Sequence, residues 1–155
     1  MYFVNREQIE SILRYMEQLL EEQANHEYRS FSEMLLLERL THLTVEAIID
    51  VGNQMIDGFI MRDPGSYEDI IDILADENVL PIDQINDYKE VVRLRKMVVQ
   101  NYTDINHADI ILVWKNQMGT LTQFPNRVRK YLDQELGPVS AFANDGVDKK
   151  TNEEL

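Results

Sequence analysis

The sequence of 155 residues contains no cysteine. Disulfide bonds, zinc–thiolate sites, iron–sulfur clusters and catalytic thiols are therefore excluded. A chain near this length buries about 68–70% of the surface that its unfolded form exposes, so a hydrophobic core alone can stabilise it. We therefore expect a single domain, and the lack of cysteine fits a reducing compartment.

Long apolar runs are also missing. The first residues, Met1 to Glu7, become charged before any apolar region develops, which is not the pattern of a secretory signal peptide. The longest candidate for a membrane span, 45–60, is interrupted by acidic and amide side chains. We therefore predict a cytoplasmic protein that does not enter a membrane. The interrupting residues are Glu46, Asp50, Asn53, Gln54 and Asp57.

Basic residues are few: 15 Lys and Arg stand against 28 Asp and Glu, and the net charge at pH 7 is −13. Such a surface repels phosphate backbones, which disfavours binding of duplex nucleic acid through a broad basic face. Any contact with RNA would require a local basic cleft. We interpret most of the negative charge as acidic side chains on solvated helix faces.

Proline is rare as well, and its four residues lie where segments of the sequence end. Between these points apolar residues recur at helical spacing, as in Ile9, Leu13, Met16 and Leu20. Strand-like alternation and internal repeats are absent. The pattern predicts an all-α protein, an up-and-down bundle of about five helices. The expected helical segments are 5–27, 30–61, 66–79, 82–102 and 106–136, the last kinked or split at Pro125.

Polar residues suited to capping stand at the start of these segments. Asn5 and Ser66 are candidate N-caps, and one of Thr103, Asp104 or Asn106 is expected to cap the last segment. The sequence 30–33 has the spacing of a capping box, a serine followed three residues later by a glutamate.

The second segment is apolar over a wide face, which favours a central position in the bundle. Gly52 in its interior lowers helix stability by roughly 0.5–1 kcal/mol relative to Ala, and close packing against another helix would explain it. We also interpret the breadth of the apolar face as a subunit interface and predict a homodimer.

The chain divides into two parts. We expect a helical domain over residues 1–138 and a polar, disordered tail over 139–155.

Motifs for nucleotides, esterase chemistry and metals are missing. We find no Walker-type loop, no dinucleotide fingerprint and no Gly-x-Ser-x-Gly elbow. His26, His42 and His107 lie far apart in sequence, without the spacing of a helical metal site. No metal site and no cofactor are therefore predicted.

The stretch 93–102 concentrates basic and polar side chains in an otherwise acidic chain. Arg95 and Tyr102 are seven residues apart and share one helix face, and Gln100 would turn towards Arg95 if the helix unwinds after Val99. A guanidinium, an amide and a phenol suit a phosphodiester, because the first stabilises phosphate charge and the others donate hydrogen bonds. The alternative is a helix end whose basic residues complement the macrodipole.

This stretch resembles the signature of the HepT-like branch of the HEPN superfamily: Arg, four residues, His, one residue, Tyr. Arg95 and Tyr102 match the first and last positions, whereas Gln100 stands in place of the histidine. The run 46–56, the junction 102–105 and the aliphatic run ending in Trp114 are also similar to this branch. The resemblance covers roughly residues 1–136.

The resemblance implies a helical bundle that dimerises so that two motifs face each other across a cleft. HepT-like proteins act as metal-independent ribonuclease toxins, and a MntA-type nucleotidyltransferase antitoxin neutralises them by adding AMP to the motif tyrosine, here Tyr102. By the same resemblance Arg95 would bind the scissile phosphate. Gln100 can donate a hydrogen bond but cannot exchange a proton. We do not expect His107, seven residues further on, to substitute for the histidine.

Several functions remain open on sequence alone. The first is a HepT-type endoribonuclease toxin, active or weakened by Gln100, restrained by a nucleotidyltransferase. The second is a non-catalytic dimeric interaction module that binds nucleotides or RNA. The third is a helical partner that completes the substrate site of a nucleotidyltransferase, and the fourth is a bundle without a small-molecule role.

Overall fold

A computed structural model describes residues 2–138, and the regular structure in this range is entirely helical. The prediction of an all-α fold is therefore confirmed. The predicted tail over 139–155 lies outside the described residues. Among the residues searched, none of the helices is long and apolar enough to cross a membrane. The elements are α1 (Arg6–Ala24), α2 (Phe31–Gly58), α3 (Tyr67–Asp76), the 3₁₀-helix η1 (Ile82–Gln84), α4 (Ile85–Arg95), the π-helix η2 (Lys96–Gln100), α5 (His107–Leu121) and α6 (Phe124–Leu136).

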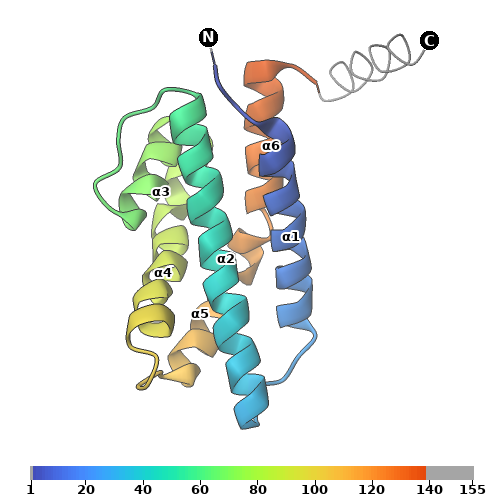
Figure 1. Ribbon diagram of the computed structural model, residues 1–155, viewed down its shortest axis with the longest axis vertical. Coiled ribbons are helices and arrows are strands. Elements are labelled where there is room, and N and C mark those ends of the chain that lie inside the picture. Colours follow the sequence, from blue (N-terminus) through green and yellow to red (C-terminus); the bar gives the residue numbers. More distant parts are fainter. Residues whose placement is uncertain (1, 139–155) are drawn as a thin grey trace, which may run out of the picture.

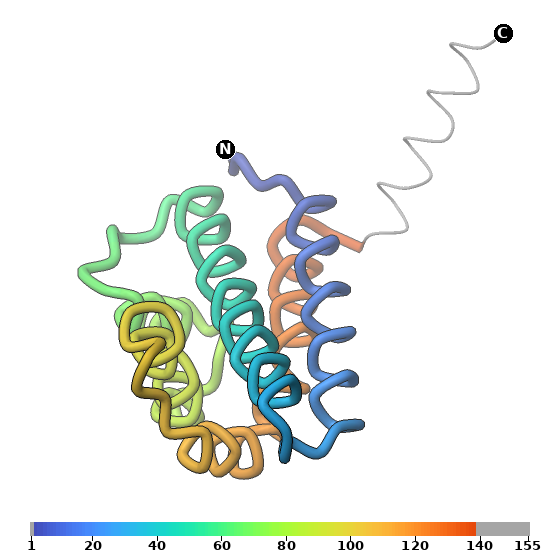
Figure 2. The backbone as a smooth tube through the Cα atoms, turned by 60° about the horizontal axis from the view of Figure 1, so that its bottom comes forward, coloured from blue at the N-terminus to red at the C-terminus, as the bar shows by residue number. Residues whose placement is uncertain are grey.

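Helix α2 lies at the centre of the bundle. It contacts α1 on one side and α3, α4 and η2 on the other (Figure 1). Helices α1 and α4 run opposite to α2, and α5 with α6 returns in the direction of α2. Helix α5 links the end of α4 to the start of α6, which packs against α1 (Figure 2). This arrangement is the up-and-down bundle expected from the helical periodicity.

The predicted caps are formed. Asn5 accepts a hydrogen bond from the backbone N–H of Gln8 (3.0 Å). Ser30 and Glu33 form both bonds of the capping box, and Asn106 is the residue that caps α5. Local side-chain chemistry therefore fixes where these three helices begin.

Three helix ends differ from the prediction. Helix α1 ends at Ala24 rather than at 27, α2 ends at Gly58 rather than at 61, and α3 ends at Asp76 rather than at 79. Pro125 splits the last segment, as expected: α5 ends at Leu121, and Pro125 lies in the first turn of α6, where its missing N–H has no helical partner to lose.

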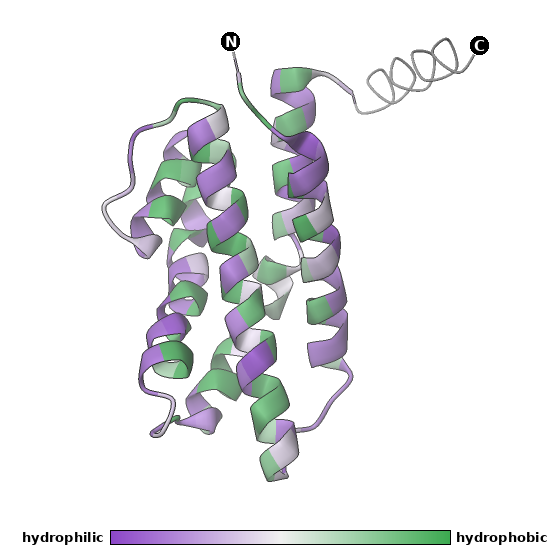
Figure 3. Ribbon diagram, viewed as in Figure 1, coloured by the Kyte–Doolittle hydropathy of each residue, from purple (hydrophilic) through white to green (hydrophobic). Residues whose placement is uncertain are grey.

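Most apolar residues of α2 are covered within the chain, whereas Phe31 and Leu35 near its start are exposed. Figure 3 shows apolar and polar residues interleaved along the helices. The buried positions go round much of α2 because helices on two sides pack against it. Packing inside one chain therefore accounts for most of the breadth of this face, and the homodimer stays a prediction. The largest fully buried side chains of α2 are those of Leu37, Ile48 and Met55.

Two buried hydrogen bonds hold α5 in place. The indole N–H of Trp114 donates to the hydroxyl of Thr41 on α2 (2.9 Å), and that hydroxyl donates to the carbonyl of Leu37 (2.7 Å). The hydroxyl of Tyr88 on α4 donates to the carbonyl of Thr120 (3.0 Å). The polar atoms of Trp114, Thr41 and Tyr88 thereby keep a partner, which avoids the cost of an unsatisfied buried group.

Close packing explains Gly52. A Cβ atom at this position would lie 2.3 Å from Cγ2 of Ile70 on α3, closer than two carbon atoms can approach. Ile70 is itself buried, so it has little room to move. The sequence-based explanation for this glycine is confirmed.

We predict that Gly52→Ala lowers the free energy of unfolding by about 1–3 kcal/mol, because the added methyl group overpacks the contact between α2 and α3. Gly119→Ala in α5 is the matched control, since a Cβ there meets no atom within 4 Å. It should raise stability by up to about 1 kcal/mol through helix propensity. Urea unfolding measures both changes, and equal effects of the two substitutions would contradict the packing explanation.

Candidate functional site

The helix changes from an α-helix to a π-helix within the predicted motif. Segment η2 follows directly on Arg95, and the backbone N–H of Asn101 bonds the carbonyl of Lys96 (3.1 Å), five residues earlier. The helix therefore changes type directly after Arg95, before Val99, the residue after which we considered unwinding. In this geometry Gln100 lies about one turn beyond Arg95. Such single π-turns are frequent at functional sites.

The Arg95 side chain is held by residues from two other helices. Its Nε donates to Oε1 of Glu46 on α2 (2.7 Å), and its guanidinium carbon lies 4.6 Å from the ring centroid of Tyr67, the first residue of α3. The hydrogen bond that Arg95 donates to Glu46 raises the pKa of Arg95, so its positive charge is secure. The ion pair and the stacked ring fix the plane and the direction of the guanidinium.

The terminal nitrogens of this guanidinium remain available. Within residues 2–138 neither terminal nitrogen donates a hydrogen bond to another group of the protein. The Arg95 side chain is 22% exposed. Nε binds the carboxylate while the two terminal NH₂ groups can donate in parallel to two oxygens of a phosphate. The structure thus leaves free the part of the side chain that recognises phosphate.

Gln100 and Tyr102 lie at the same end of α4 as Arg95. Gln100 is exposed at the end of η2, and Tyr102, in the turn before α5, is 68% exposed. A hydrogen bond from Asp104 N–H to the Asn101 carbonyl (3.0 Å) closes this turn. Between residues 2 and 138 no hydrogen bond joins the three predicted site residues to one another, so the bundle presents them separately to solvent.

The other cations of the stretch behave differently from Arg95. Arg93 pairs with Glu68 on α3 at the surface (2.9 Å), and Lys96 is exposed. Arg95 points to a carboxylate on another helix rather than to the carbonyls at the end of its own. The alternative explanation, compensation of the helix macrodipole, therefore does not account for the position of Arg95.

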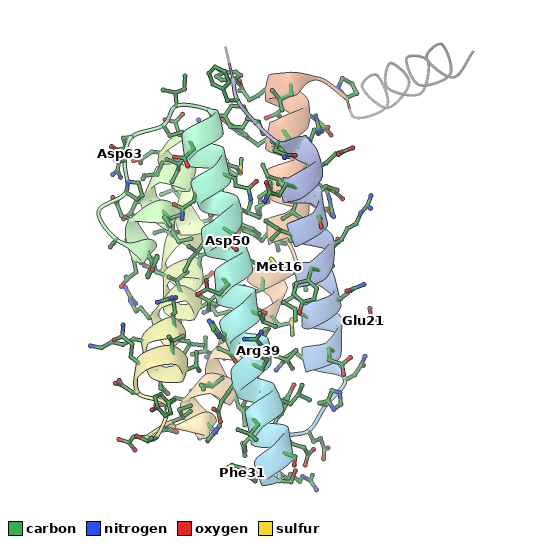
Figure 4. The ribbon with its side chains drawn as sticks, in the orientation of Figure 1. Met16, Glu21, Phe31, Arg39, Asp50 and Asp63 are labelled. Carbon is green, nitrogen blue, oxygen red and sulfur yellow. The ribbon has the colours of Figure 1, made fainter. Side chains whose placement is uncertain are left out.

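Sequence reasoning missed the part of the site that α2 contributes. Four ionisable residues follow one another at intervals of four and therefore share one face of α2. This spacing was the signal that could have identified them, because such an ionisable row on a central helix requires partners. Figure 4 shows this helix from Phe31 at its start to Asp50 at the end of the row. The members of the row are Glu38, His42, Glu46 and Asp50.

Side chains from α4 and α5 contact residues of this row. Nε2 of His107, the first residue of α5, lies 2.8 Å from Oε2 of Glu38. Nε2 of His42 lies 3.6 Å from Oε1 of Glu46, the oxygen that also accepts from Arg95. The row therefore places the imidazole of His42 between two glutamates beside the Arg95 guanidinium, and the imidazole of His107 contacts the row from α5.

The pKa of Asp50 reflects the electrostatic environment of this row. Its pKa is raised above the usual value, first by partial desolvation and then by the negative charge of Glu46, one turn away. The ionised form is therefore disfavoured in the folded state. Asp50 costs stability at neutral pH, and this cost disappears as the pH falls through the raised pKa.

Two cavities lie away from this site. One is lined by the connection between α1 and α2 together with α5, and the other by the connection between α3 and α4 together with α6. Among the residues searched, no group of three His, Cys, Asp or Glu side chains could hold a metal ion.

We predict that Glu46→Gln lowers the pKa of Asp50, because it removes a neighbouring negative charge. The pKa should remain above the ordinary value, since desolvation, the larger cause, is unchanged. Carboxyl-selective NMR titration measures the shift. Glu38→Gln, three turns from Asp50, is the control and should leave its pKa in place; an unchanged pKa in Glu46→Gln would contradict this electrostatic description.

Comparisons with known proteins place this geometry in context. The family model described as Ribonuclease HepT-like matches residues 6–128. A curated relative from Bacillus subtilis (strain 168), named "Putative RNase YutE", is 46% identical over 143 residues, which cover 92% of this chain and 99% of the relative.

Solved structures show the same fold. That of the cytosolic protein of unknown function YutE from Bacillus subtilis superposes with a TM-score of 0.87 at 44% identity, covering 91% of this chain and 99% of the other. A chain from the crystal structure of a toxin–antitoxin with AMP-PNP superposes with a TM-score of 0.64 at 17% identity, covering 78% and 95%. The second likeness concerns the fold alone. With a family model spanning most of the described residues and a relative of this identity, the chain belongs to the HepT-like ribonuclease family.

Proposed function

We propose that this protein is a metal-independent endoribonuclease of the HepT type, the toxin of a toxin–antitoxin pair. The observation that carries the proposal is the state of Arg95. Glu46 binds its Nε and Tyr67 stacks on its plane, while neither terminal NH₂ group has a hydrogen-bond partner among residues 2–138. A guanidinium fixed in this way is prepared to bind the scissile phosphate and to stabilise the charge that develops on it.

The remaining motif residues have narrower roles in this proposal. Gln100 donates a hydrogen bond that orients the phosphate, but its amide exchanges no proton at neutral pH. Catalysis from this position alone is therefore weaker than with a histidine. Lys96, an exposed residue on the same stretch, adds positive charge where an acidic protein would otherwise repel RNA.

We further propose a MntA-type nucleotidyltransferase as the partner, a homodimer as the assembly and the cytoplasm as the location. The exposure of Tyr102 supports the first of these, because a tyrosine that accepts AMP must enter another enzyme's active site. The homodimer would bring the motifs of two copies together. The proposed unit is the helical domain 1–138, with 139–155 as a tail.

A second candidate function is favoured by Gln100. A bundle that retains Arg95 but lacks the histidine suits a non-catalytic dimeric module, one that binds nucleotides or RNA and acts with a nucleotidyltransferase. Such a module needs a fixed phosphate-binding guanidinium and no proton-transfer group.

We predict that Arg95→Ala reduces cleavage of a labelled single-stranded RNA by about 100-fold or more, since a charged group at the phosphate is lost. The assay contains a metal chelator. Arg93→Ala is the matched control, two residues earlier on α4 and paired with Glu68 at the surface, and should change the rate by less than about threefold. Equal rates for wild type and Arg95→Ala would refute the ribonuclease proposal.

The same assay separates the two candidates. Cleavage by the wild-type chain supports the ribonuclease. If wild type does not cleave and Gln100→His does, the result supports the non-catalytic module. The missing imidazole is then the only difference between the inactive wild-type chain and an active ribonuclease.

We predict that incubation with ATP and the cognate nucleotidyltransferase adds AMP to the wild-type chain but not to Tyr102→Phe. Intact-mass spectrometry measures the adduct. Tyr15→Phe, a similarly half-exposed tyrosine on α1, is the control and should be modified like wild type. An adduct on Tyr102→Phe, or none on wild type, contradicts the proposed modification.

A further inference from the structure

His42 shares a carboxylate oxygen with Arg95. Its Nε2 lies 3.6 Å from Oε1 of Glu46, and the same oxygen accepts from Nε of Arg95 at 2.7 Å. The imidazole and the guanidinium therefore meet at one atom, although they come from α2 and α4. The His42 side chain is 31% exposed, so a bound ligand can reach it.

The site needs an imidazole that the α4 motif does not supply. Gln100 cannot take or give a proton at neutral pH, whereas acid–base catalysis requires a group that can. Of the two other histidines in the sequence, His26 lies in the connection between α1 and α2 and contacts Glu22 (2.6 Å). His107 contacts Glu38 at 2.8 Å, and Glu38 is two turns from Glu46. His42 is the histidine in contact with the partner of Arg95.

The contact between His42 and Glu46 leaves the imidazole free to act. A distance of 3.6 Å is longer than a hydrogen bond, so Nε2 is not committed to the carboxylate. The carboxylate nevertheless lies close enough to stabilise an imidazolium once it forms. The short contact of His107 with Glu38 ties up the corresponding nitrogen of that residue.

We propose that His42 is the proton-transfer residue of this site and replaces, from α2, the imidazole that Gln100 does not provide. This inference rests on the proposed ribonuclease function. The ligand is a single-stranded RNA whose scissile phosphate lies on the free NH₂ groups of Arg95, with the neighbouring ribose 2′-hydroxyl facing Nε2 of His42.

The step is an internal transfer of the phosphodiester. Neutral His42 takes the proton of the 2′-hydroxyl as the O2′–P bond forms. The P–O5′ bond breaks, and its electron pair goes to O5′. The imidazolium returns the proton to O5′ through a water molecule. The products are a 2′,3′-cyclic phosphate and a free 5′-hydroxyl, and no metal ion or other reactant is consumed.

The test compares His42→Gln with wild type by two measurements on the full chain. The first is the rate of cleavage of a labelled single-stranded RNA in the presence of a chelator. The second is the Kd for the same RNA with 2′-deoxyribose at every position, which cannot be cleaved. His26→Gln is the matched control, because His26, in the connection between α1 and α2, also forms a pair with a glutamate four residues away. Thermal unfolding verifies that each variant is folded.

A proton-transfer role predicts that His42→Gln lowers the cleavage rate by about 100-fold or more, in the usual range of acid–base catalysis, while Kd stays within about twofold. His26→Gln should cleave like wild type. If Kd weakens as much as the rate, His42 only positions Arg95, and the proposal is wrong.

Other outcomes separate this proposal from the proposed function. If His42→Gln cleaves at the wild-type rate while Arg95→Ala does not cleave, the ribonuclease stands and His42 is not its proton-transfer residue. If wild type is inactive and Gln100→His cleaves, His42 does not replace the missing imidazole and the non-catalytic module is favoured. If Arg95→Ala and His42→Gln both match wild type, both proposals fail.

Discussion

The ion pair between Glu46 and Arg95 is the interaction on which the candidate site depends. It joins α2 to α4 at a distance of 2.7 Å, with the two side chains 31% and 22% exposed. Ion pairs at a surface contribute only about 0–1 kcal/mol to stability. This ion pair matters because of its geometry. Glu46 binds Nε of the guanidinium and leaves the two terminal nitrogens without a partner among residues 2–138. Together with Tyr67, which stacks on the guanidinium plane, it fixes the direction of those nitrogens. Glu46 also brings His42 to the same point and raises the pKa of Asp50.

The bundle makes that ion pair possible through the central position of α2. Gly52 lets α3 approach α2 closely, which places Tyr67 at the start of α3 within reach of Arg95. On the other side, the bond between Trp114 and Thr41 seats α5 on α2. The π-helix then ends α4 in a turn that carries Tyr102 out to solvent. A rigid core thus supports a site whose reactive groups remain accessible.

Local patterns predicted most of the fold, because helix periodicity, caps and the split at Pro125 depend on neighbours along the chain. They also located Arg95 and Tyr102, through the spacing of one short motif. Glu46 was missed because its bond to Arg95 spans 49 residues, and no local rule states which helix faces meet. Tyr67 and His42 were missed for the same reason. The chain's own helices cover most of the broad apolar face of α2, from which we predicted dimerisation, so the homodimer stays a prediction.

The central claim is that phosphate binds on the guanidinium that Glu46 holds. NMR titration with a non-cleavable 2′-deoxy oligonucleotide tests it most directly, through the side-chain signals of arginine Nε–H, glutamine amide and histidine ring groups. We predict the largest shifts at Arg95, Gln100 and His42. Shifts concentrated instead at Arg127 and Lys130, the cations that line the cavity beside α6, would contradict the account.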